Sequence, residues 1–503
     1  MNAYDNLPYQ SYAISITAPA YLEMQARLRG LIPPSFNTAD VLEIGCGDGA
    51  NLLPLAYYNP EANFLGIDAS AAHIDQALTA QKELGLNNVE FLLMDISQYQ
   101  TAKKFDYIIV HGVFSWVPEA VRDAILQFVK SNLSAKGLFY VSYNCTPGWS
   151  IRGLVRQQLF NADQQGSGSQ DVEKGLTLCG ELSALIKGND SPYSVLLQQE
   201  LERVGKFNPS YIAHEYLSDI NQDFIFSAVA ALAKDYELDY VGDANDFRPE
   251  GLVDYALYEQ LNKTYPASQR EDIIDLICFR QMRASVFCKN DSTFKRVDDD
   301  FEFEAFNLIG RFDFAPHWQS NLYGEMQFKN DGGLVFTIRN PLVKIALVMI
   351  SQAWPNGYKL NSFNRKNIES SLSLDIDSID DLIHENRQEL VEAIRLLHWH
   401  GLLELALNNP IAPSVIPDYP LLNRLSAFEI RHKSAITSGT HKIIWLSPLQ
   451  RAVLQLLDGK STKQEIAGLV LAQAINTDEA QNNLEQFIDK TLQLLATWDL
   501  FAR

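Results

Sequence analysis

The chain has 503 residues, with a hydrophobic fraction of 47% and a charged fraction of 20%, which indicates a globular protein of about two to four domains. Its formal net charge of −21 disfavours a nucleic-acid substrate, because a phosphate backbone is repelled and no run of Lys or Arg offers a basic patch. The five cysteines contain no C-x-x-C pair, so the sequence predicts neither a disulfide framework nor a structural zinc site.

The sequence contains no recognisable targeting or membrane signal. Residues 1–5 lack the basic and apolar regions of a signal peptide. The most apolar span, residues 342–350, is short and includes Lys344, which excludes a membrane crossing. We therefore expect a cytoplasmic protein without membrane insertion.

In the first 150 residues, short apolar runs alternate with helical patterns. The spacing of apolar residues predicts helices over residues 70–84 and 118–133, which Gly85 and Gly137 end. Because strands separated by such helices form right-handed crossover units, we expect a parallel sheet that binds ligands at the carboxyl ends of its strands. The predicted strands are residues 41–44, 64–68, 89–94, 105–110 and 138–143.

A glycine-rich loop, Glu43-Ile44-Gly45-Cys46-Gly47-Asp48-Gly49, follows the first predicted strand. Its glycines allow a tight turn and close approach to a ligand, and the helix beginning near Asn51 presents free N–H groups. Asp68 ends the second strand, where it can accept hydrogen bonds from both ribose hydroxyls. Through Ala50, however, the loop also satisfies the dinucleotide fingerprint G-x-G-x-x-G/A.

Three features favour S-adenosylmethionine over a dinucleotide. Glu43 can meet the methionine ammonium and would repel a pyrophosphate, Gly49 supplies a third glycine, and Asp95 can reach an adenine amino group. A turn that binds nothing, with Asp68 and Asp95 as helix caps, is the remaining alternative. No metal is expected. The predicted cofactor-binding residues are Glu43, Gly45, Cys46, Gly47, Gly49, Asn51, Asp68, Ala69, Asp95, Ile96 and His111.

Residues 43–52 resemble the first motif of class I methyltransferases. The stretches 4–9, 111–118 and 143–149 resemble a bacterial family with a methyltransferase regulatory domain, which includes protein-lysine N-methyltransferases acting on outer-membrane proteins. The regulatory domain's start resembles Tyr211-Ile212-Ala213-His214-Glu215-Tyr216-Leu217, and its end resembles Phe279-Arg280-Gln281-Met282-Arg283. The resemblance extends to about residue 290 and implies transfer of a methyl group to a lysine amine. One departure is Ala18-Pro19, where relatives often carry His-Pro.

Methyl transfer to an amine needs an oriented, deprotonated nucleophile and a site that excludes water. Aromatic rings line such a site well, because they tolerate a cationic methylammonium. A purely structural role is the alternative for each tryptophan and histidine. The catalytic candidates are His111, Tyr143, His214 and Glu215, and the predicted substrate channel comprises Trp116, Asn144, Trp149 and Tyr9.

Strand-like runs at residues 236–241 and 285–288 are predicted to complete a seven-stranded sheet whose last strand is antiparallel. The N-terminal methyltransferase core then spans residues 1–150, and the regulatory segment spans residues 211–295. The intervening residues 151–210 form a helical insert, and the sequence leaves open whether this insert covers the site or forms a homodimer contact.

The last 200 residues contain an internal repeat. Asn340-Pro341-Leu342-x-Lys344 is echoed by Ser447-Pro448-Leu449-x-Arg451, and each begins with a capping residue followed by Pro. The shared order of strand, helix, turn, helix, long helix and strand predicts two winged-helix-like modules, residues 296–410 and 411–503. DNA binding is disfavoured because residues 462–466 carry a single base, so we expect the modules to hold a protein partner or substrate.

The sequence therefore predicts an α/β fold, a Rossmann-like class I methyltransferase domain followed by two winged-helix-like modules. The expected activity is S-adenosylmethionine-dependent N-methylation of protein lysines. One alternative is a small-molecule methyltransferase, although such a substrate needs no extended C-terminal docking surface. The other is a catalytically inactive binding or regulatory protein, against which the complete set of Glu43, Gly45, Gly47, Asp68 and Asp95 argues.

Overall fold

The computed structural model describes residues 11–164, 172–244, 253–290, 306–372, 379–407, 416–472, 478–498 and 500–502. The chain forms two compact units. Unit 1 comprises residues 1–12 and 33–294, and unit 2 comprises residues 13–32 and 295–503. The predicted first domain, residues 1–150, is therefore not continuous, since residues 13–32 belong with the C-terminal part of the chain.

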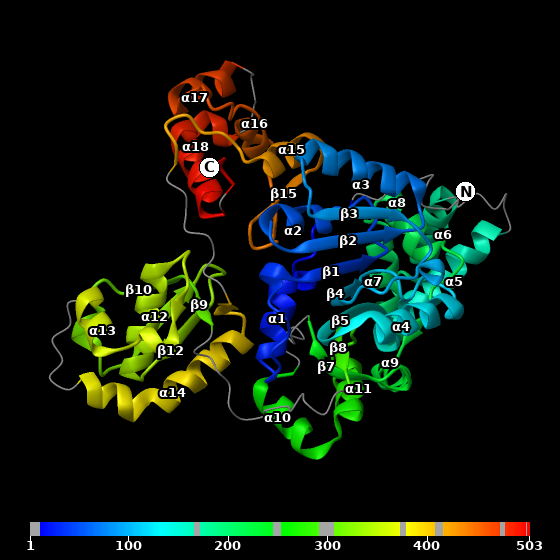
Figure 1. The fold of residues 1–503 in the computed structure, drawn as a ribbon, viewed down its shortest axis with the longest axis horizontal. Helices are drawn as coiled ribbons and strands as arrows, with labels where there is room; N and C mark the ends of the chain where they lie inside the picture. Colours follow the sequence, from blue (N-terminus) through cyan, green and yellow to red (C-terminus); the bar gives the residue numbers. More distant parts are fainter. Residues whose placement is uncertain are drawn as a thin grey trace. The chain divides into compact units, whose positions relative to one another are not determined.

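Unit 1 is built on one sheet with the strand order β3-β2-β1-β4-β5-β8-β7 (Figure 1). The first five strands run parallel, and β8 is antiparallel to both of its neighbours. The short strand β6 (Asp223–Phe224) pairs with the end of β5. The seven-stranded prediction is confirmed, including the two strands of the regulatory segment. The strands are β1 (Asp40–Ile44), β2 (Asn63–Asp68), β3 (Val89–Leu93), β4 (Phe105–Val110), β5 (Leu133–Cys145), β7 (Leu238–Asp243) and β8 (Met282–Lys289).

Helices cover both faces of this sheet. On one face, α4 (Glu119–Asn132) and α9 (Phe226–Asp235) bury an apolar core that includes Ile108, Phe139 and Phe287. The helices α2 (Leu52–Tyr58) and α3 (Ala71–Leu84) follow β1 and β2. Helix α3 begins where Ser70 accepts a hydrogen bond from a backbone N–H and ends at left-handed Gly85, as the sequence predicts.

A group of helices from the insert forms a second, smaller core in unit 1. Helix α8 (Pro209–Tyr216), which opens the regulatory segment, packs with the insert through Ile212 and Tyr216. Figure 1 draws these helices together beside the sheet. The insert helices are α5 (Thr146–Gln164), α6 (Val172–Ile186) and α7 (Pro192–Val204), and α10 (Tyr255–Thr264) and α11 (Ala267–Ile277) precede β8.

The first module of unit 2 has two three-stranded sheets, β10-β11-β12 and β13-β9-β14. Its core buries the apolar span Leu342–Ile350 of α12 together with Met24 and Leu28 from α1 and its C-terminal end. No helix in the described ranges is both long and apolar enough to cross a membrane. The elements are α1 (Pro19–Arg27), β9 (Asn307–Ile309), β10 (Phe312–Phe314), β11 (Met326–Asn330), β12 (Val335–Ile338), α12 (Pro341–Ala353), β13 (Tyr358–Lys359), α13 (Arg365–Leu372), α14 (Ile379–Trp399) and β14 (Glu404–Ala406).

From the Pro-initiated helix onward, the second module repeats the order of the first, three helices followed by a strand or bridge, which confirms the predicted repeat. In the first module, β9 lies between β13 and β14, and in the second the bridges from Leu421 to Asp458 and from Leu422 to Phe501 give the same arrangement. The capping residues Asn340 and Ser447 both accept a backbone hydrogen bond. The elements are α15 (Arg424–His432), β15 (Ala435–Thr437), β16 (Ile443–Trp445), α16 (Pro448–Gln455), α17 (Lys463–Ala472) and α18 (Asp478–Thr497).

Candidate functional site

Glu43 lies near the carboxyl end of β1 with 3% of its surface exposed. One carboxylate oxygen accepts a hydrogen bond from Asn51 Nδ2 at 3.0 Å, and the other is buried without a hydrogen-bond partner among the described residues. Burial raises the pKa of Glu43 to about 8, and repulsion from Asp68 and Asp48 adds to the rise. A cation beside this buried carboxyl group, such as the methionine ammonium, would offset the cost of ionising it.

The loop after β1 takes backbone conformations that favour glycine. Gly45, Gly47 and Gly49 have φ angles of 76°, 55° and 77°. A Cβ on Gly45 would lie 2.4 Å from a methyl group of Val113, and one on Gly49 would lie 2.7 Å from the ring of Phe91. The predicted glycines are therefore required by both conformation and space at residues 45 and 49.

Asp68 closes the same loop from the end of β2. One carboxylate oxygen accepts from the backbone N–H of Gly47 at 2.9 Å, and the other accepts from Ser70 at 2.8 Å. Burial alone would raise the pKa of Asp68, but hydrogen bonds from His73, Ser70 and Gly47 hold it below its usual value. The carboxylate is thus ionised and fixed, and it retains lone pairs for ribose hydroxyls. The neighbouring Ala69 is exposed.

Asp95 and Cys46 have structural partners of their own. Exposed Asp95 caps a short 3-10 helix that begins at buried Ile96, because it accepts hydrogen bonds from Ser97 N and Oγ at 2.9 and 2.7 Å. Cys46 is buried, and burial raises the pKa of its thiol well above the usual value. A Cβ on Gly66 would lie 2.7 Å from Cys46 Sγ, so this strand glycine makes room for the loop. The sequence-based site omitted Gly66, although a glycine inside a strand can mark close backbone approach.

His111 directly follows β4 and contacts a tyrosine that the sequence-based site omitted. His111 Nδ1 lies 2.8 Å from Tyr140 Oη, and the two rings are stacked with an interplanar angle of 20°. Burial lowers the pKa of His111 to about 4, so the imidazole is neutral at pH 7. Because Glu43 is in register with Ile109, two residues before His111, Glu43 and His111 lie on the same face of the sheet.

Tyr143 lies on the other face of the sheet from Tyr140. Its hydroxyl is 3.0 Å from Ser285 Oγ, and its ring meets Phe224 edge to face. Only 2% of Tyr143 is exposed, within the core covered by α4 and α9. The structure therefore brings Tyr143 together with β8 rather than with His111.

Trp116 and Trp149 meet at the carboxyl ends of β4 and β5. Their rings are in T-shaped contact, with centroids 6.1 Å apart. Ser115 joins three segments here, because its Oγ accepts from Asn144 N at 2.9 Å and its carbonyl accepts from Gln222 N at 2.8 Å. The Asn144 amide also donates to Asn221 Oδ1 at 3.0 Å. The predicted channel residue Tyr9 lies outside the described residues.

Glu215 lies on α8, facing α5. Burial raises the pKa of Glu215 to about 7, although Arg152 and Arg156 of α5 oppose the rise. The Arg152 guanidinium lies 4.9 Å from the centre of the Trp149 ring, so Glu215 and the tryptophan pair share a neighbour. His214, on the same helix, is partly exposed. Arg152 is a further residue that the sequence-based site omitted.

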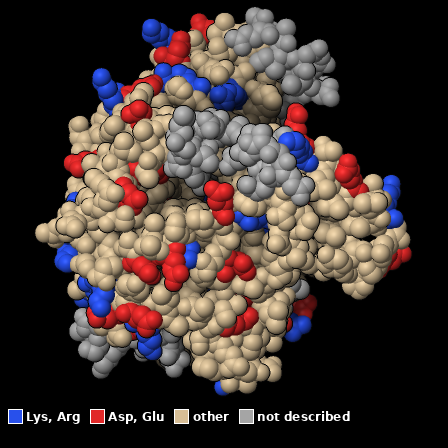
Figure 2. Space-filling view, turned by 90° about the vertical axis from the view of Figure 1, so that its right-hand side faces the viewer, with Lys and Arg blue, Asp and Glu red and all other residues tan. Residues whose placement is uncertain are grey.

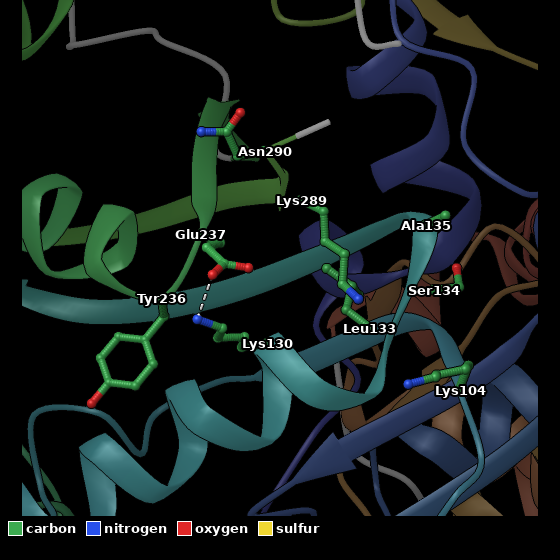
Figure 3. A pocket seen from close by; sticks show the side chains of 9 residues that line it. All are labelled: Lys104, Lys130, Leu133, Ser134, Ala135, Tyr236, Glu237, Lys289 and Asn290. Atoms are coloured by element: carbon green, nitrogen blue, oxygen red, sulfur yellow. Dashed lines mark hydrogen bonds and ion pairs between the residues drawn. The ribbon is translucent and has the colours of Figure 1, made fainter. Parts of the chain in front are cut away.

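A cavity of about 450 Å³ opens at the opposite end of the strands from the loop after β1 (Figure 3). Lys104 lies before β4 and Lys289 ends antiparallel β8, so the cavity is at the amino ends of the parallel strands. Lys130 pairs with Glu237 at 2.6 Å across it. The cavity is therefore separate from the loop after β1, and we assign it no part in the donor site.

Charged side chains of both signs are interspersed on the face shown in Figure 2. Lys463, the single base in the predicted recognition region of the second module, forms an ion pair with Asp489 at 2.5 Å. No group of three His, Cys, Asp or Glu side chains in the described ranges is arranged to hold a metal ion.

Models of three domain families match successive parts of the chain. Residues 36–208 match a methyltransferase domain, residues 208–289 a predicted methyltransferase regulatory domain, and residues 418–497 the PKMT C-terminal winged helix domain. The boundary at residue 208 coincides with the N-cap of α8.

Two relatives of the chain come from the bacterium Rickettsia prowazekii. The uncharacterized protein RP789 of Rickettsia prowazekii is 28% identical over 93% of this chain and 86% of its own length. The uncharacterized protein RP028 of the same organism is 33% identical over 44% of this chain and 90% of its own length.

A solved structure has the same fold as the whole chain. PKMT2 from Rickettsia typhi, also solved in complex with AdoHcy, is 24% identical, covers 98% of this chain and 100% of its own, and superposes with a TM-score of 0.83. The geometry of the loop after β1 and the match to a methyltransferase domain both indicate an S-adenosylmethionine site. The chain belongs to the bacterial family of S-adenosylmethionine-dependent methyltransferases that carry a methyltransferase regulatory domain and a PKMT-type winged helix.

Proposed function

We propose that the protein transfers a methyl group from S-adenosylmethionine to the side-chain amine of lysine residues in a protein substrate. The single observation that carries the acceptor class is the pair Trp116 and Trp149, whose neighbour Arg152 also interacts with Glu215. Two aromatic rings and a partly buried carboxylate with a pKa of about 7 suit an amine that arrives protonated and must lose a proton.

The donor site follows from the loop after β1. Glu43 binds the ammonium of the methionine moiety, Asp68 accepts the ribose hydroxyls, and Asp95 and Ile96 hold the adenine. The turn of Gly45, Gly47 and Gly49, together with Cys46, lets the backbone approach the cofactor. When bound, S-adenosylmethionine supplies an electrophilic methyl group on its sulfonium.

On the acceptor side, Glu215 takes the proton from the incoming lysine ammonium. Its pKa of about 7 leaves it ionised in about half of the molecules at neutral pH, so it can act as a general base there. Neutral His111 and its partner Tyr140 orient groups close to the donor rather than remove the proton, because His111 ionises only near pH 4. The tryptophan rings keep water from the amine.

The winged-helix modules support a protein substrate rather than a small one. Residues 418–497 match a domain family named for PKMT, and the relative of known structure is itself PKMT2. Protein substrates gain affinity from docking surfaces remote from the reacting amine, which a small acceptor does not need.

The test is to incubate the protein with radiolabelled S-adenosylmethionine and a lysate of its host. Label should enter protein, and acid hydrolysis should release it as methylated lysine. Label confined to small molecules would overturn the lysine proposal, and failure to bind S-adenosylhomocysteine in calorimetry would overturn the donor site. The Glu215→Gln variant should retain S-adenosylhomocysteine binding while losing transfer, and Glu181→Gln, an exposed substitution on α6, should retain both.

A further inference from the structure

We propose that Arg280 and Gln281, at the start of β8, position Trp149 and so shape the acceptor side of the site, an inference that rests on the proposed function. These residues lie in the stretch Phe279-Arg280-Gln281-Met282-Arg283, for which the proposed reaction has no other use. They act through two separate connections to Trp149, one through the backbone and one through side chains.

The first connection is a backbone clamp on the start of α5. Cys145 N donates to Gln281 O, and Gly148 N donates to Arg280 O, both at 2.9 Å. A Cβ on Gly148 would lie 2.4 Å from Arg280 O and 2.5 Å from Gln281 Cα. The two segments of the chain are thus in contact at Gly148, the residue before Trp149. We expect a shift of residues 280 and 281 to move the tryptophan with them.

The clamp is itself held by a buried ionic cluster. Arg280 forms ion pairs with Asp275 at 2.8 Å and Asp243 at 3.1 Å, and its backbone N donates to Asp275 O. Fully buried Arg283 pairs with the same two carboxylates, both at 2.7 Å. Phe279, which precedes the clamp, has a φ angle of 48°, a conformation that side chains rarely adopt. The surrounding contacts therefore fix the path of the chain here.

The second connection runs through side chains of α7 and α5. Arg203 of α7 donates to Gln281 Oε1 at 2.9 Å and also pairs with Glu200. Glu200 lies 3.5 Å from Arg152 Nε, and Arg152 in turn lies over the Trp149 ring. Arg152 thus lies over the Trp149 ring, the backbone of Arg280 holds the preceding residue Gly148, and both connections lead back to residues 280 and 281.

A tryptophan held through two connections keeps its ring in a constant position beside Trp116. Geometry of this kind decides how often the bound amine lies in line with the donated methyl group. The regulatory segment therefore supplies part of the acceptor wall as well as two strands of the sheet. Loss of the clamp should change acceptor handling without changing the donor site, which is built from β1 and β2.

The test uses the full chain and the variant Gln281→Met, which keeps the side-chain volume but cannot accept from Arg203. With 5-fluorotryptophan incorporated, the ¹⁹F resonance that disappears in Trp149→Phe reports on Trp149. This resonance should shift or broaden in Gln281→Met, and KM for the methyl acceptor should rise about tenfold, equivalent to ~1.4 kcal/mol. The affinity for S-adenosylhomocysteine should change less than twofold.

Two matched variants make the result decisive. Gln281→Glu keeps an acceptor for Arg203 and should restore both the resonance and KM, whereas Lys263→Met, an exposed lysine on α10 of unit 1, should change neither. An unchanged Trp149 resonance in Gln281→Met overturns the positioning proposal. The resonance and the S-adenosylhomocysteine affinity need no methyl acceptor, so a failure of the lysine proposal would leave them unaffected and remain distinguishable.

Discussion

Glu43 and Asn51 form a hydrogen bond of 3.0 Å that satisfies only one of the two carboxylate oxygens. The residue before the helix thus orients the carboxylate while leaving the second oxygen to a ligand. Burial without a cation raises the pKa of Glu43 to about 8, so the free protein holds this carboxyl mostly protonated at pH 7. Binding of an ammonium group beside it must reverse that state.

Cofactor binding should therefore release protons. At pH 7, S-adenosylhomocysteine should displace close to one proton from Glu43, because a group with a pKa near 8 is about 90% protonated there. Calorimetry in buffers of different ionisation enthalpy measures this number. Glu43→Gln should abolish the release and weaken binding about tenfold or more, through loss of a charged hydrogen bond of ~1.5 kcal/mol. Glu90→Gln, an exposed carboxyl on β3, should change neither quantity.

The same group should make stability depend on pH in the absence of ligand. The pKa of Glu43 is raised from 4.5 to about 8 on folding, so the folded state disfavours its ionised form. Its contribution to stability is complete below about pH 4.5 and is lost as the pH rises through 8. The Tm of Glu43→Gln should therefore gain on that of the unmodified protein between pH 5 and pH 8. A constant difference in Tm over this range would contradict the assignment.

Gly45 should not tolerate a side chain. Alanine at this φ angle of 76° costs about 1–2 kcal/mol, and its Cβ would overlap Val113. Gly45→Ala should lower the affinity for S-adenosylhomocysteine at least tenfold. Gly180→Ala, in an exposed position of α6 with open space around it, should instead leave binding unchanged and stabilise the protein by about 0.5–1 kcal/mol. Equal effects of the two substitutions on binding would argue against the close packing of the loop.

The rate of methyl transfer should rise with pH through the pKa of Glu215. Since the base must be ionised, kcat/KM should increase up to about pH 7 and then level off with respect to this group. Glu215→Gln should remove this limb and lower kcat by roughly 10²–10⁴-fold. A limb that persists in Glu215→Gln would assign the base elsewhere, and a limb near pH 4 would point to His111.

Substitution of Arg283 should lower the stability of unit 1. This side chain is fully buried and pairs with Asp243, Glu271 and Asp275, so Arg283→Met removes the cation that these three buried carboxylates share. Arg280 and Arg270 remain as cationic partners of these carboxylates. The free energy of unfolding in urea should fall by about 3–5 kcal/mol at pH 7. The deficit should shrink at pH 5, where the buried carboxyls can protonate. Arg339→Met, with an exposed ion pair, should cost less than about 0.5 kcal/mol.

The periodic parts of the fold could be predicted because their signals are local. Apolar runs identified the strands, and Gly85 marked the end of α3 correctly. Gly137 was wrongly predicted to end α4, since that helix ends at Asn132 and Gly137 lies within β5. The repeat in unit 2 was visible because Asn340-Pro341 and Ser447-Pro448 begin equivalent helices. The donor loop could be predicted because glycine readily adopts positive φ angles. The spacing of Gly45, Gly47 and Gly49 therefore indicated a tight turn at this point of the chain.

Other features depend on pairings that no local pattern records. Whether Tyr140 or Tyr143 of β5 faces His111 is set by the register with β4, and a shift of one residue would exchange them. Arg203 and Gln281 are far apart in sequence, as are Glu200 and Arg152, so their contacts follow only from the packing of α5, α7 and β8. The placement of α1 in unit 2 likewise has no signal in residues 19–27 alone.

That placement of α1 affects the order in which the two units can fold during synthesis. Met24 and Leu28 emerge from the ribosome with the first part of the chain, but their partners begin at Phe306. At about 5–20 residues per second, the roughly 280 intervening residues take on the order of 15–60 s to translate. During that interval the residues of the unit 1 sheet are synthesised, while the apolar side chains of α1 still lack the residues that bury them. The nascent protein therefore has a built-in interval in which a chaperone can bind near its N-terminus, and unit 2 is the last part to close.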